Sequence, residues 1–551
     1  MCGIWAVFGS DDNVSVQCNA VHKIGHRGPD AFRIENINHL QNCCLGFHRL
    51  SIVDDIRGMQ PMRLYTHPNI WLVYNGEIYN HKLLDKEFDL SLSTEVDGEP
   101  IIHLYNLYGA EAMAKQLDGV FAFCILDVVN RKVILGRDTY GVRPLFRFQT
   151  EDGFLGVCSE AKGLYGLSHT LSDDNVHIEP FPPGHIEVYE LDLQGKAFLK
   201  ERTCFNRPGQ FPLYTTRISS FSEDVKTNVA QLLEAAVEKR LMADVRIGCL
   251  LSGGLDSSLV AAIFVKLAKA RGIAYPLQTF SIGMEGSPDL RAARKVADYL
   301  GTEHHEVMMT PEEGIDAIDS VIYHLESYDI TTVRASVGMF LLSKYIKEKT
   351  NTTVILSGEG ADEVAQGYIY FHHAPSPSEG DEESRRLLDN LHYFDVLRSD
   401  RATAAWGLEV RVPFLDHQFS SYYLSLDSEL RQPHDGVEKN LLRSAFAESN
   451  LLPNEILWRP KEAFSDGISS MSRSWYEIIQ DYCQEQVNDN ELKEASRLYP
   501  HNTPKTKESF YYRQRFEKHY AGKGKWIPYF WMPAWSTSDD PSARTLKQYK
   551  Q

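Results

Sequence analysis

The stretch at residues 252–258, SGGLDSS, constrains the fold more than any other, because it joins two segments of different hydrophobic period. Residues 247–251 form a short, mostly apolar run, typical of a strand buried on both faces. Residues 259–267 repeat apolar side chains at helical spacing. A glycine-rich turn that leads into a helix N-terminus presents unpaired N–H groups and binds anions. The stretch therefore predicts a phosphate site at the edge of a parallel sheet.

Asp256 is the unexpected residue in this stretch, since a carboxylate would repel a bound phosphate unless a divalent cation lay between them. We interpret Asp256 as a Mg²⁺ ligand, although an ordinary capped turn also uses Gly, Ser and Asp. The stretch resembles the SGGxDS loop of the ATP pyrophosphatase family, and no Walker-type GxxxxGK[ST] motif is present. The resemblance implies ATP as a substrate that is cleaved to AMP and pyrophosphate. The implied loop contacts are Ser252, Gly253, Gly254, Leu255, Asp256 and Ser257.

Length and composition limit the classes of function. A chain of 551 residues is too long for one ordinary domain. Its net charge of −18 argues against binding to nucleic acid or to an anionic membrane, because both need a basic surface. No apolar run is long enough for a membrane span, and the N-terminus lacks the basic segment of a secretory signal. Small molecules are therefore the expected partners of so acidic a chain. Nine cysteines without a CxxC pair indicate reduced thiols in the cytosol.

The first half of the chain begins MCGIWAVFG, and its second residue is a candidate nucleophile. Removal of Met1 would place a thiol and a free amine on Cys2, and the amine could then act as the base for the thiol. The strings GHRGPD (25–30), FHRLSIVD (47–54), VYNGEIYN (73–80) and VDGE (96–99) follow. Taken singly, NGE reads as a hairpin turn, and Arg49 or Asp97 as a solvated charge.

Together with Cys2, these strings closely resemble the class II glutamine amidotransferase domain, which is an N-terminal nucleophile hydrolase. The resemblance implies that Cys2 attacks the side-chain amide of glutamine, and that Asn75 and the N–H of Gly76 form the oxyanion hole. It also implies that an arginine binds the α-carboxylate of glutamine and that two acids bind its α-amino group. The implied glutamine-binding residues are Arg49, Leu50, Ser51, Ile52, Val53, Asn75, Gly76, Glu77 and Asp97.

The second half repeats the pattern of an apolar strand followed by a polar bend. PLQTFSIGM (276–284) and TVILSGEGADE (353–363) resemble further parts of the same nucleotide site, whereas the acidic, Ser/Pro-rich residues 374–385 are expected to form a mobile loop. The resemblance implies Leu250 and Ile282 at the adenine, Ser357 and Gly358 at the nucleotide, and Asp362 as the second Mg²⁺ ligand. The implied residues around the adenylation step are Glu359, Arg334, which would stabilise the departing pyrophosphate, and Lys461 of WRPKEAFSDG.

The order of these motifs covers nearly the whole chain and is similar to the glutamine-hydrolysing asparagine synthetase family, nearest to its eukaryotic cytosolic type. The resemblance implies an α+β sandwich of the N-terminal nucleophile type (αββα) over residues 1–205 and a linker over 206–222. An α/β domain with a parallel sheet and additional helices then follows over 223–551. The substrates would be glutamine, aspartate and ATP, and the family tends to form homodimers.

The reaction that this family membership implies has two halves. ATP would adenylate the β-carboxylate of aspartate, and ammonia released from glutamine would pass between the two sites and displace AMP to give asparagine. Two alternatives remain open at this point. One is another amide-forming or ring-forming synthetase of the same fold, such as a β-lactam synthetase relative, and the other is a non-catalytic sensor of amino acids or nucleotides that retains the pockets.

Overall fold

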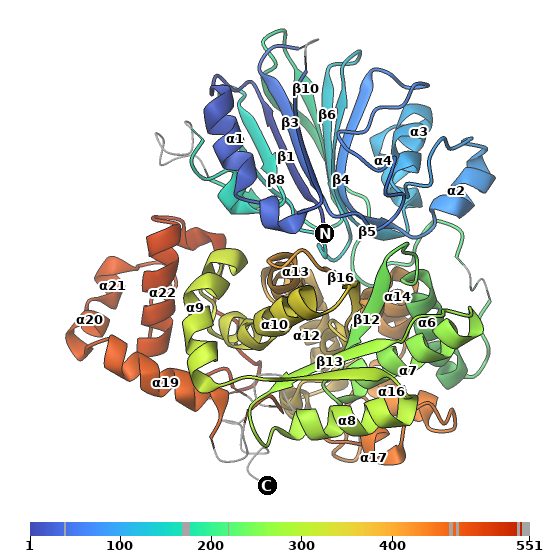
Figure 1. Cartoon of the computed structure of the whole chain (residues 1–551), viewed down its shortest axis with the longest axis vertical. Coiled ribbons are helices and arrows are strands. Elements are labelled where there is room, and N and C mark those ends of the chain that lie inside the picture. The colour runs from blue at the N-terminus through green and yellow to red at the C-terminus, as the bar shows by residue number, and fades with distance from the viewer. Residues whose placement is uncertain are drawn as a thin grey trace. The chain divides into compact units, whose positions relative to one another are not determined.

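The computed structural model describes residues 1–37, 40–167, 177–216, 218, 220–461, 467–469, 473–536 and 540–542. The chain divides into two compact units, which are described separately (Figure 1). The N-terminal unit comprises Met1–Thr216 together with two short later segments, Met242–Val245 and Gly407–Glu409. The remaining residues form the C-terminal unit. The two later segments are a feature that the sequence motifs did not predict.

The N-terminal unit contains two antiparallel sheets. The first has the strand order β2-β3-β1-β8-β7-β9, and the second the order β11-β10-β6-β5-β4. The strands are β1 (Gly3–Phe8), β2 (Ala31–Asn36), β3 (Cys43–Arg49), β4 (Ile70–Ile78), β5 (Gly119–Asp127), β6 (Lys132–Arg137), β7 (Phe146–Gln149), β8 (Leu155–Cys158), β9 (Glu179–Pro180), β10 (His185–Leu191) and β11 (Ala197–Cys204).

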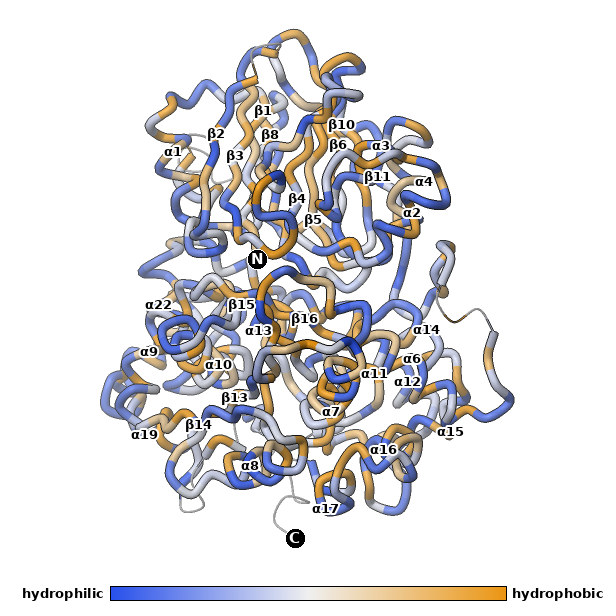
Figure 2. Tube along the Cα trace, turned by 45° about the vertical axis from the view of Figure 1, so that its right-hand side comes forward, coloured by the Kyte–Doolittle hydropathy of each residue, from blue (hydrophilic) through white to orange (hydrophobic). Residues whose placement is uncertain are grey.

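One apolar core lies between these two sheets, and it contains side chains of β1, β3 and β8 together with those of β4, β5 and β6. A second core lies between the second sheet and α2 (His81–Phe88), α3 (Glu99–Tyr108) and α4 (Ala110–Gln116). On the first sheet, α1 (Val14–His22) packs so closely that a Cβ on Gly46 would lie 2.8 Å from the Val21 side chain. Strands β4 and β5 are mostly orange in Figure 2, as expected for strands covered on both faces. The predicted αββα layering is therefore confirmed.

The C-terminal unit is built on a sheet of order β14-β13-β12-β15-β16, in which the first four strands run parallel. These strands are β12 (Arg246–Leu250), β13 (Gln278–Gly283), β14 (Glu303–Met308) and β15 (Thr352–Leu356), and β16 (Glu409–Arg411) completes the sheet. The central strands β12 and β15 are neighbours, so the polar bends that follow them meet at one edge. This confirms the predicted parallel sheet. The first helices are α6 (Val225–Lys239), α7 (Leu255–Ala270), α8 (Pro288–Leu300), α9 (Pro311–Leu325) and α10 (Ile330–Lys349).

The expectation of a mobile loop at residues 374–385 is wrong, because this stretch begins helix α12 (Pro377–Asn390). The Ser376 side chain caps the helix by accepting a hydrogen bond from the Glu379 N–H, and Pro377 occupies the first turn, where proline is tolerated. Composition suggested a loop, although the same Ser and Pro residues are helix-start signals. The later helices are α11 (Ala361–Val364), α13 (Asp395–Ala404), α14 (His417–Ser425), α15 (Ser428–Arg431), α16 (Asn440–Phe446), α17 (Asn454–Leu457), α19 (Trp475–Gln486), α20 (Asp489–Lys493), α21 (Ala495–Leu498) and α22 (Lys507–His519).

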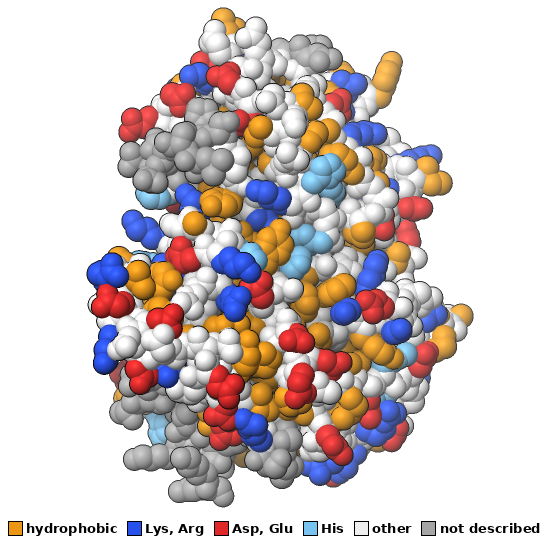
Figure 3. All heavy atoms as spheres, turned by 60° about the vertical axis from the view of Figure 1, so that its left-hand side comes forward, with side chains coloured by type: hydrophobic (Ala, Val, Ile, Leu, Met, Phe, Trp, Pro, Cys, Tyr) orange, Lys and Arg blue, Asp and Glu red, His pale blue; other side chains and the backbone are white. Residues whose placement is uncertain are grey.

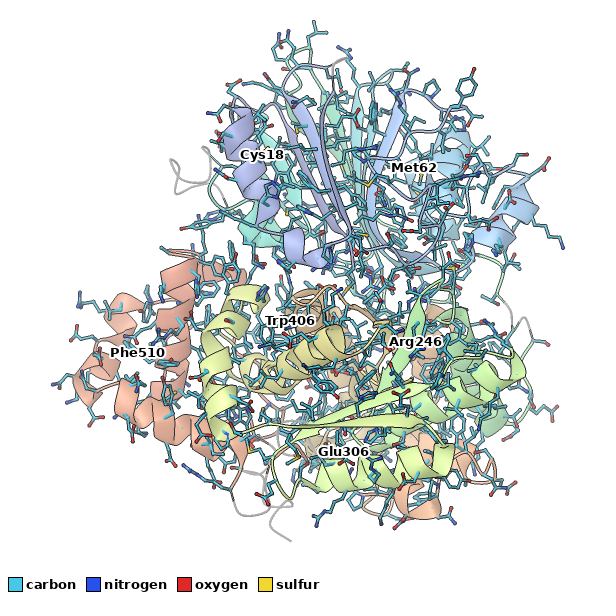
Figure 4. All side chains as sticks on the ribbon, in the orientation of Figure 1. Cys18, Met62, Arg246, Glu306, Trp406 and Phe510 are labelled. Carbon is cyan, nitrogen blue, oxygen red and sulfur yellow. The ribbon has the colours of Figure 1, made fainter. Side chains whose placement is uncertain are left out.

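Side chains fill the space between the layers of each unit (Figure 4); Met62, for example, is buried in the core beside β4. On the face shown in Figure 3, acidic and basic side chains are interspersed. None of the helices described here is both long and apolar enough to cross a membrane.

Candidate functional site

Cys2 lies directly before β1, with its Sγ 3.5 Å from the backbone nitrogen of Leu50, which donates to it. The Arg27 guanidinium donates to the carbonyl of Cys2 over 3.0 Å and fixes the backbone there. Burial raises the pKa of the Cys2 thiol, so the thiol needs a nearby base to become a nucleophile. Burial also lowers the pKa of the Met1 α-amino group to about 6.

Strand β4 carries Asn75, Gly76 and Glu77, so these residues do not form the hairpin turn that NGE suggests when read alone. A Cβ at position 76 would lie 2.1 Å from the carbonyl oxygen of Val120 on β5, so the strand pairing requires glycine there. The side-chain amide of Asn75 is buried, and neither of its polar atoms has a hydrogen-bond partner in the described part of the chain. A buried, unpaired amide beside Cys2 is a ready donor for a substrate oxygen.

Arg49 and Asp97 are both buried at the same cavity. The guanidinium of Arg49 donates to the carbonyls of Asp54 (2.6 Å) and Asp55 (2.5 Å), which hold it in place. Asp97 accepts from the N–H of Ile78 (2.6 Å) and from the Tyr74 hydroxyl (2.9 Å), while its burial raises its pKa. The two charges therefore have fixed positions before any ligand binds.

The cavity at Cys2 has a volume of about 30 Å³ and contains all the predicted glutamine-site residues except Ser51. The N–H of Ser51 instead donates to Asp30 over 2.8 Å. Glu409 comes from the short segment of the chain that returns to this unit, and it lies 3.7 Å from the Arg143 guanidinium. The lining residues that the sequence motifs missed are Gly58, Gln60, Tyr74, Val96 and Glu409.

The second site lies in the C-terminal unit, where helix α7 begins immediately after the glycine-rich turn. Gly253 has a φ of +73°, and a Cβ there would lie 2.4 Å from the backbone nitrogen of Ala293, so glycine is required. Gly358 is equally constrained, because its Cβ would lie 2.9 Å from the Cβ of Asp256. These close approaches bring the bends after β12 and β15 together at the N-terminus of α7, where the helix dipole favours an anion.

Asp256 and Asp362 project from these two bends toward the same lysine. The Lys439 ammonium lies 2.6 Å from Asp256 and 2.5 Å from Asp362, and its side chain is only 1% exposed. Lys461 lies 2.6 Å from Asp362 and 3.7 Å from Asp256. Although burial acts to raise its pKa, the two lysines hold the pKa of Asp362 well below its ordinary value. The Asp362 carboxylate is therefore ionised, and both carboxylates converge on the Lys439 ammonium.

Glu359 also lines this cavity. The Arg398 guanidinium contacts Glu359 over 2.5 Å and also contacts Asp395 over 2.8 Å. Burial raises the pKa of Glu359, and the opposite charge of Arg398 counteracts that shift. The lining also contains apolar side chains, among them Leu250 and Ile282, whose contact with adenine stays a prediction. Further apolar lining residues are Leu251, Phe280, Met339 and Leu342.

This cavity has a volume of about 210 Å³ and contains all the predicted nucleotide-site residues except Gly253 and Arg334. Gly253 acts through the backbone geometry described above. Arg334 is different, because its buried guanidinium is bound by Glu508 (2.6 and 2.7 Å) and Asp540 (2.8 and 2.9 Å). Both carboxylates hold the guanidinium outside the residues that line the cavity, and the pyrophosphate role of Arg334 stays a prediction. The lining residues that sequence reasoning missed include Asp289, Tyr368, Asp395, Arg398, Lys439, Arg459 and Trp531.

Together, the folds and the two cavities define a class of protein: an amidotransferase with an N-terminal thiol, coupled in one chain to a nucleotide-dependent synthetase. Comparison with known proteins agrees with this class. The family model for the glutamine amidotransferase domain matches residues 1–181, and the model for asparagine synthase matches residues 228–383 and 374–543.

Curated relatives match along their full length. The glutamine-hydrolysing asparagine synthetase of Gallus gallus is 62% identical over 557 residues, which covers 100% of this chain and 99% of that protein. The corresponding proteins of Cricetulus griseus and Homo sapiens are 60% and 59% identical, with the same coverage. The chain therefore belongs to the glutamine-hydrolysing asparagine synthetase family, as the sequence motifs predicted.

Proposed function

We propose that this chain makes asparagine from aspartate, with ATP as the energy source and glutamine as the nitrogen donor. One observation carries the proposal: a single chain contains both a buried thiol beside an unpaired amide and a pair of carboxylates at a helix N-terminus. The first arrangement suits hydrolysis of a carboxamide, and the second suits attack on a nucleoside triphosphate. A single chain needs both sites only if the ammonia released at the first is used at the second.

In the N-terminal unit, Cys2 is the proposed nucleophile and its own α-amine, exposed by removal of Met1, the proposed base. The thiolate attacks the side-chain carbon of glutamine, while Asn75 and the N–H of Gly76 stabilise the negative oxygen. Ammonia leaves, and water then releases glutamate from the thioester. Arg49 would hold the α-carboxylate of glutamine.

Glu77 and Asp97 are the proposed partners of the α-ammonium group of glutamine, because both are buried acids at the Cys2 cavity. The backbone of Leu50 fits a contact role, since its N–H and carbonyl both lie within 3.6 Å of the Cys2 sulfur. Ile52 and Val53 line the remainder of the wall. Ser51 is not among the lining residues, and its backbone contact with glutamine stays a prediction.

In the C-terminal unit, the phosphates of ATP would lie over the N-terminus of α7, with its adenine among the apolar side chains that include Leu250 and Ile282. The loop Ser252–Ser257 and the bend at Ser357 would supply hydroxyl and N–H donors. Lys461 is the proposed electrostatic partner of the phosphates and the acyl-adenylate. Glu359 is the proposed group that positions the acceptor beside the α-phosphate. The β-carboxylate of aspartate displaces pyrophosphate, and ammonia then displaces AMP from the mixed anhydride to form asparagine.

Mg²⁺ fits the two carboxylates of this site. Asp256 and Asp362 already converge on one cation, the Lys439 ammonium, and Asp256 Oδ1 is buried without a partner in the described part of the chain. No group of three or more His, Cys, Asp or Glu side chains that could hold a metal ion occurs among the described residues. Two carboxylates suffice when phosphates and water supply the remaining Mg²⁺ ligands. The cation would neutralise charge on the phosphates, and the two aspartates would hold it.

An assay of all three substrates tests the proposed function against its alternatives. Purified protein is incubated with ATP, aspartate and glutamine labelled at the amide nitrogen, and AMP, pyrophosphate and asparagine are measured. Labelled asparagine with matching AMP supports the proposal. A β-lactam-type synthetase would form no asparagine, and a sensor would bind ligands without turnover. Either result would overturn the proposal.

Two further features belong to the proposal. We infer a cytosolic enzyme, because all nine cysteines are free and disulfides are rare in that compartment. We also infer a homodimer, from the tendency of the family. Cell fractionation tests the location, and light scattering coupled to size exclusion tests the oligomeric state.

A further inference from the structure

The C-terminal segment of the chain contributes an aromatic side chain to the synthetase cavity. Trp531 is one of the residues that line this cavity together with Asp256 and Glu359, and it is 7% exposed. Its backbone N–H donates to Asp329 over 2.8 Å, and Asp329 also caps helix α10 through the N–H of Thr332. The backbone of Trp531 is therefore held at a fixed position beside the cavity.

Trp531 belongs to a group of lining residues that the proposed nucleotide contacts do not include. The adenine and phosphates of ATP, placed as proposed above, would contact the apolar lining residues and the N-terminus of α7. The aromatic and charged lining residues outside these contacts are Tyr368, Phe394, Asp395, Arg398 and Trp531. The ring of Trp531 lies 5.6 Å from that of Tyr368, between centroids.

These lining residues also contain unsatisfied polar groups. Arg398 is 6% exposed, and its Nη1 has no hydrogen-bond partner in the described part of the chain, although its Nη2 binds Glu359 and Asp395. A buried donor without a partner is unfavourable unless a ligand satisfies it. A carboxylate is the ligand group that best matches a guanidinium edge. The hydroxyl of Tyr368 contacts Glu363 (2.6 Å) and Asp395 (3.1 Å), so acids suited to an ammonium group lie beside it.

We propose that Trp531 is the wall that fixes the length of the acceptor amino acid, and that the C-terminal segment thereby determines the preference for aspartate. The inference rests on the proposed function. An amino acid with its β-carboxylate at the α-phosphate must direct its α-carboxylate and α-ammonium toward Arg398 and Asp395. The indole closes the space behind these groups. Glutamate, which is one methylene longer, would need room that Trp531 occupies, and the indole also excludes water from the acyl-adenylate.

The segment on both sides of Trp531 is anchored by aromatic and ionic contacts. Before it, the ring of Tyr529 packs 5.3 Å from Phe394. After it, Trp535 packs on Tyr370 at 6.0 Å, and Asp540 is held by Arg334. Arg334 is in turn paired with Glu508 of α22, the helix on which Phe510 is labelled in Figure 4. Arg334 thus links the C-terminal segment to α22.

Trp535 gives a matched control, because it packs against the same aromatic cluster as Trp531 but does not line the cavity. Exchange of labelled pyrophosphate into ATP is measured with aspartate and with glutamate for the full chain and for Trp531→Ala and Trp535→Ala. Trp531→Ala should raise the KM for aspartate at least about tenfold and should raise the glutamate to aspartate ratio of kcat/KM by about 10-fold or more, the usual range for one methylene. Its KM for ATP should stay within about twofold, because the nucleotide lies elsewhere in the cavity.

Trp535→Ala should lower the melting temperature without changing the selectivity. Unchanged selectivity in Trp531→Ala would overturn the inference, and so would an equal change in both variants, since the effect would then be structural. If Trp531→Ala does not fold, Trp531→Leu provides the same test with an apolar side chain retained. The absence of aspartate-dependent exchange in the unmodified protein would instead refute the proposed function, so the two failures are distinguishable.

Discussion

Replacing Lys439 with methionine tests whether the buried Lys439 ammonium compensates the negative charges of Asp256 and Asp362 in the synthetase site. The ammonium lies 2.6 Å from Asp256 and 2.5 Å from Asp362, and the lysine is buried. Removing one member of a buried ion pair costs about 3 to 5 kcal/mol, because the remaining charge is left uncompensated. Lys461 stays within 2.6 Å of Asp362 and compensates part of this loss. We therefore expect Lys439→Met to lose about 2 to 4 kcal/mol of unfolding free energy.

The assay for this variant is thermal unfolding at pH 7, with and without about 10 mM Mg²⁺. The melting temperature of the C-terminal unit should fall by about 2 to 8 °C, and Mg²⁺ should restore much of the loss in the variant while changing the unmodified protein little. Lys295→Met is the control, because its ion pair with Glu455 is more than half exposed and should contribute less than about 1 kcal/mol. Retained glutaminase activity would show that the N-terminal unit is intact. Equal, small losses in both variants, or no selective response to Mg²⁺, would refute the reasoning.

Three further predictions concern single residues. Cys2→Ala should lower glutaminase activity and glutamine-driven synthesis by at least about a thousandfold, while ammonium salts at alkaline pH should still support asparagine formation; loss of both activities would show that Cys2 is structural. Asp256→Asn should abolish asparagine formation from either nitrogen source and spare glutaminase, and normal pyrophosphate release by this variant would contradict the Mg²⁺ assignment. Burial lowers the pKa of His48 to about 4, so the folded state excludes a proton that the unfolded chain binds, and stability falls as the pH falls from about 6.5 to about 4. His48→Gln should remove up to about 3 kcal/mol of this pH dependence, measured as denaturant midpoints at several pH values; an unchanged pH slope would place the effect elsewhere.

The layered fold and most of the two sites were predictable because their residues lie in local strings. Strand β4 presents Asn75, Gly76 and Glu77 together, and the bend after β15 presents Ser357 and Gly358 together. Each string is a strand end or a close-packed strand, where local sequence and backbone geometry agree. The resemblance then placed these strings in one order along the chain.

The residues that were missed come from positions where the local sequence carries no sign of function. Lys439 adopts a left-handed backbone conformation, with a φ of 56°, yet its surroundings read as an ordinary helix start. Glu409 joins the Cys2 cavity only because a distant segment returns to the N-terminal unit. From the local sequence, Arg398 looks like an ordinary charged residue of a helix, and Trp531 looks like an ordinary aromatic residue of a core. Only the tertiary fold brings such side chains to a cavity.

Partners that are distant in the chain have the same origin. A string that resembles a family motif predicts Arg334 near the nucleotide, but no local pattern connects it to Glu508 and Asp540, the acids that bind it. The loop expected at residues 374–385 was inferred from composition, whereas the Ser376 cap and Pro377 set the start of a helix. Composition describes solubility better than it describes backbone conformation.

The pairing of Arg334 with Asp540 has a consequence for how the protein is made on the ribosome. These two residues are 206 positions apart in the chain, and Glu508 is 174 positions from Arg334. At typical synthesis rates of about 5 to 20 residues per second, an emerging Arg334 would wait about 10 to 40 s for Asp540 to be added. During that time, the buried side of α10 lacks its counter-ions, so the C-terminal unit cannot complete its packing until Asp540 has been added. Nascent chains of this protein should therefore depend on chaperones until then, and a stop codon between those of Glu508 and Asp540 should yield a chain that is degraded and does not accumulate as a shortened enzyme.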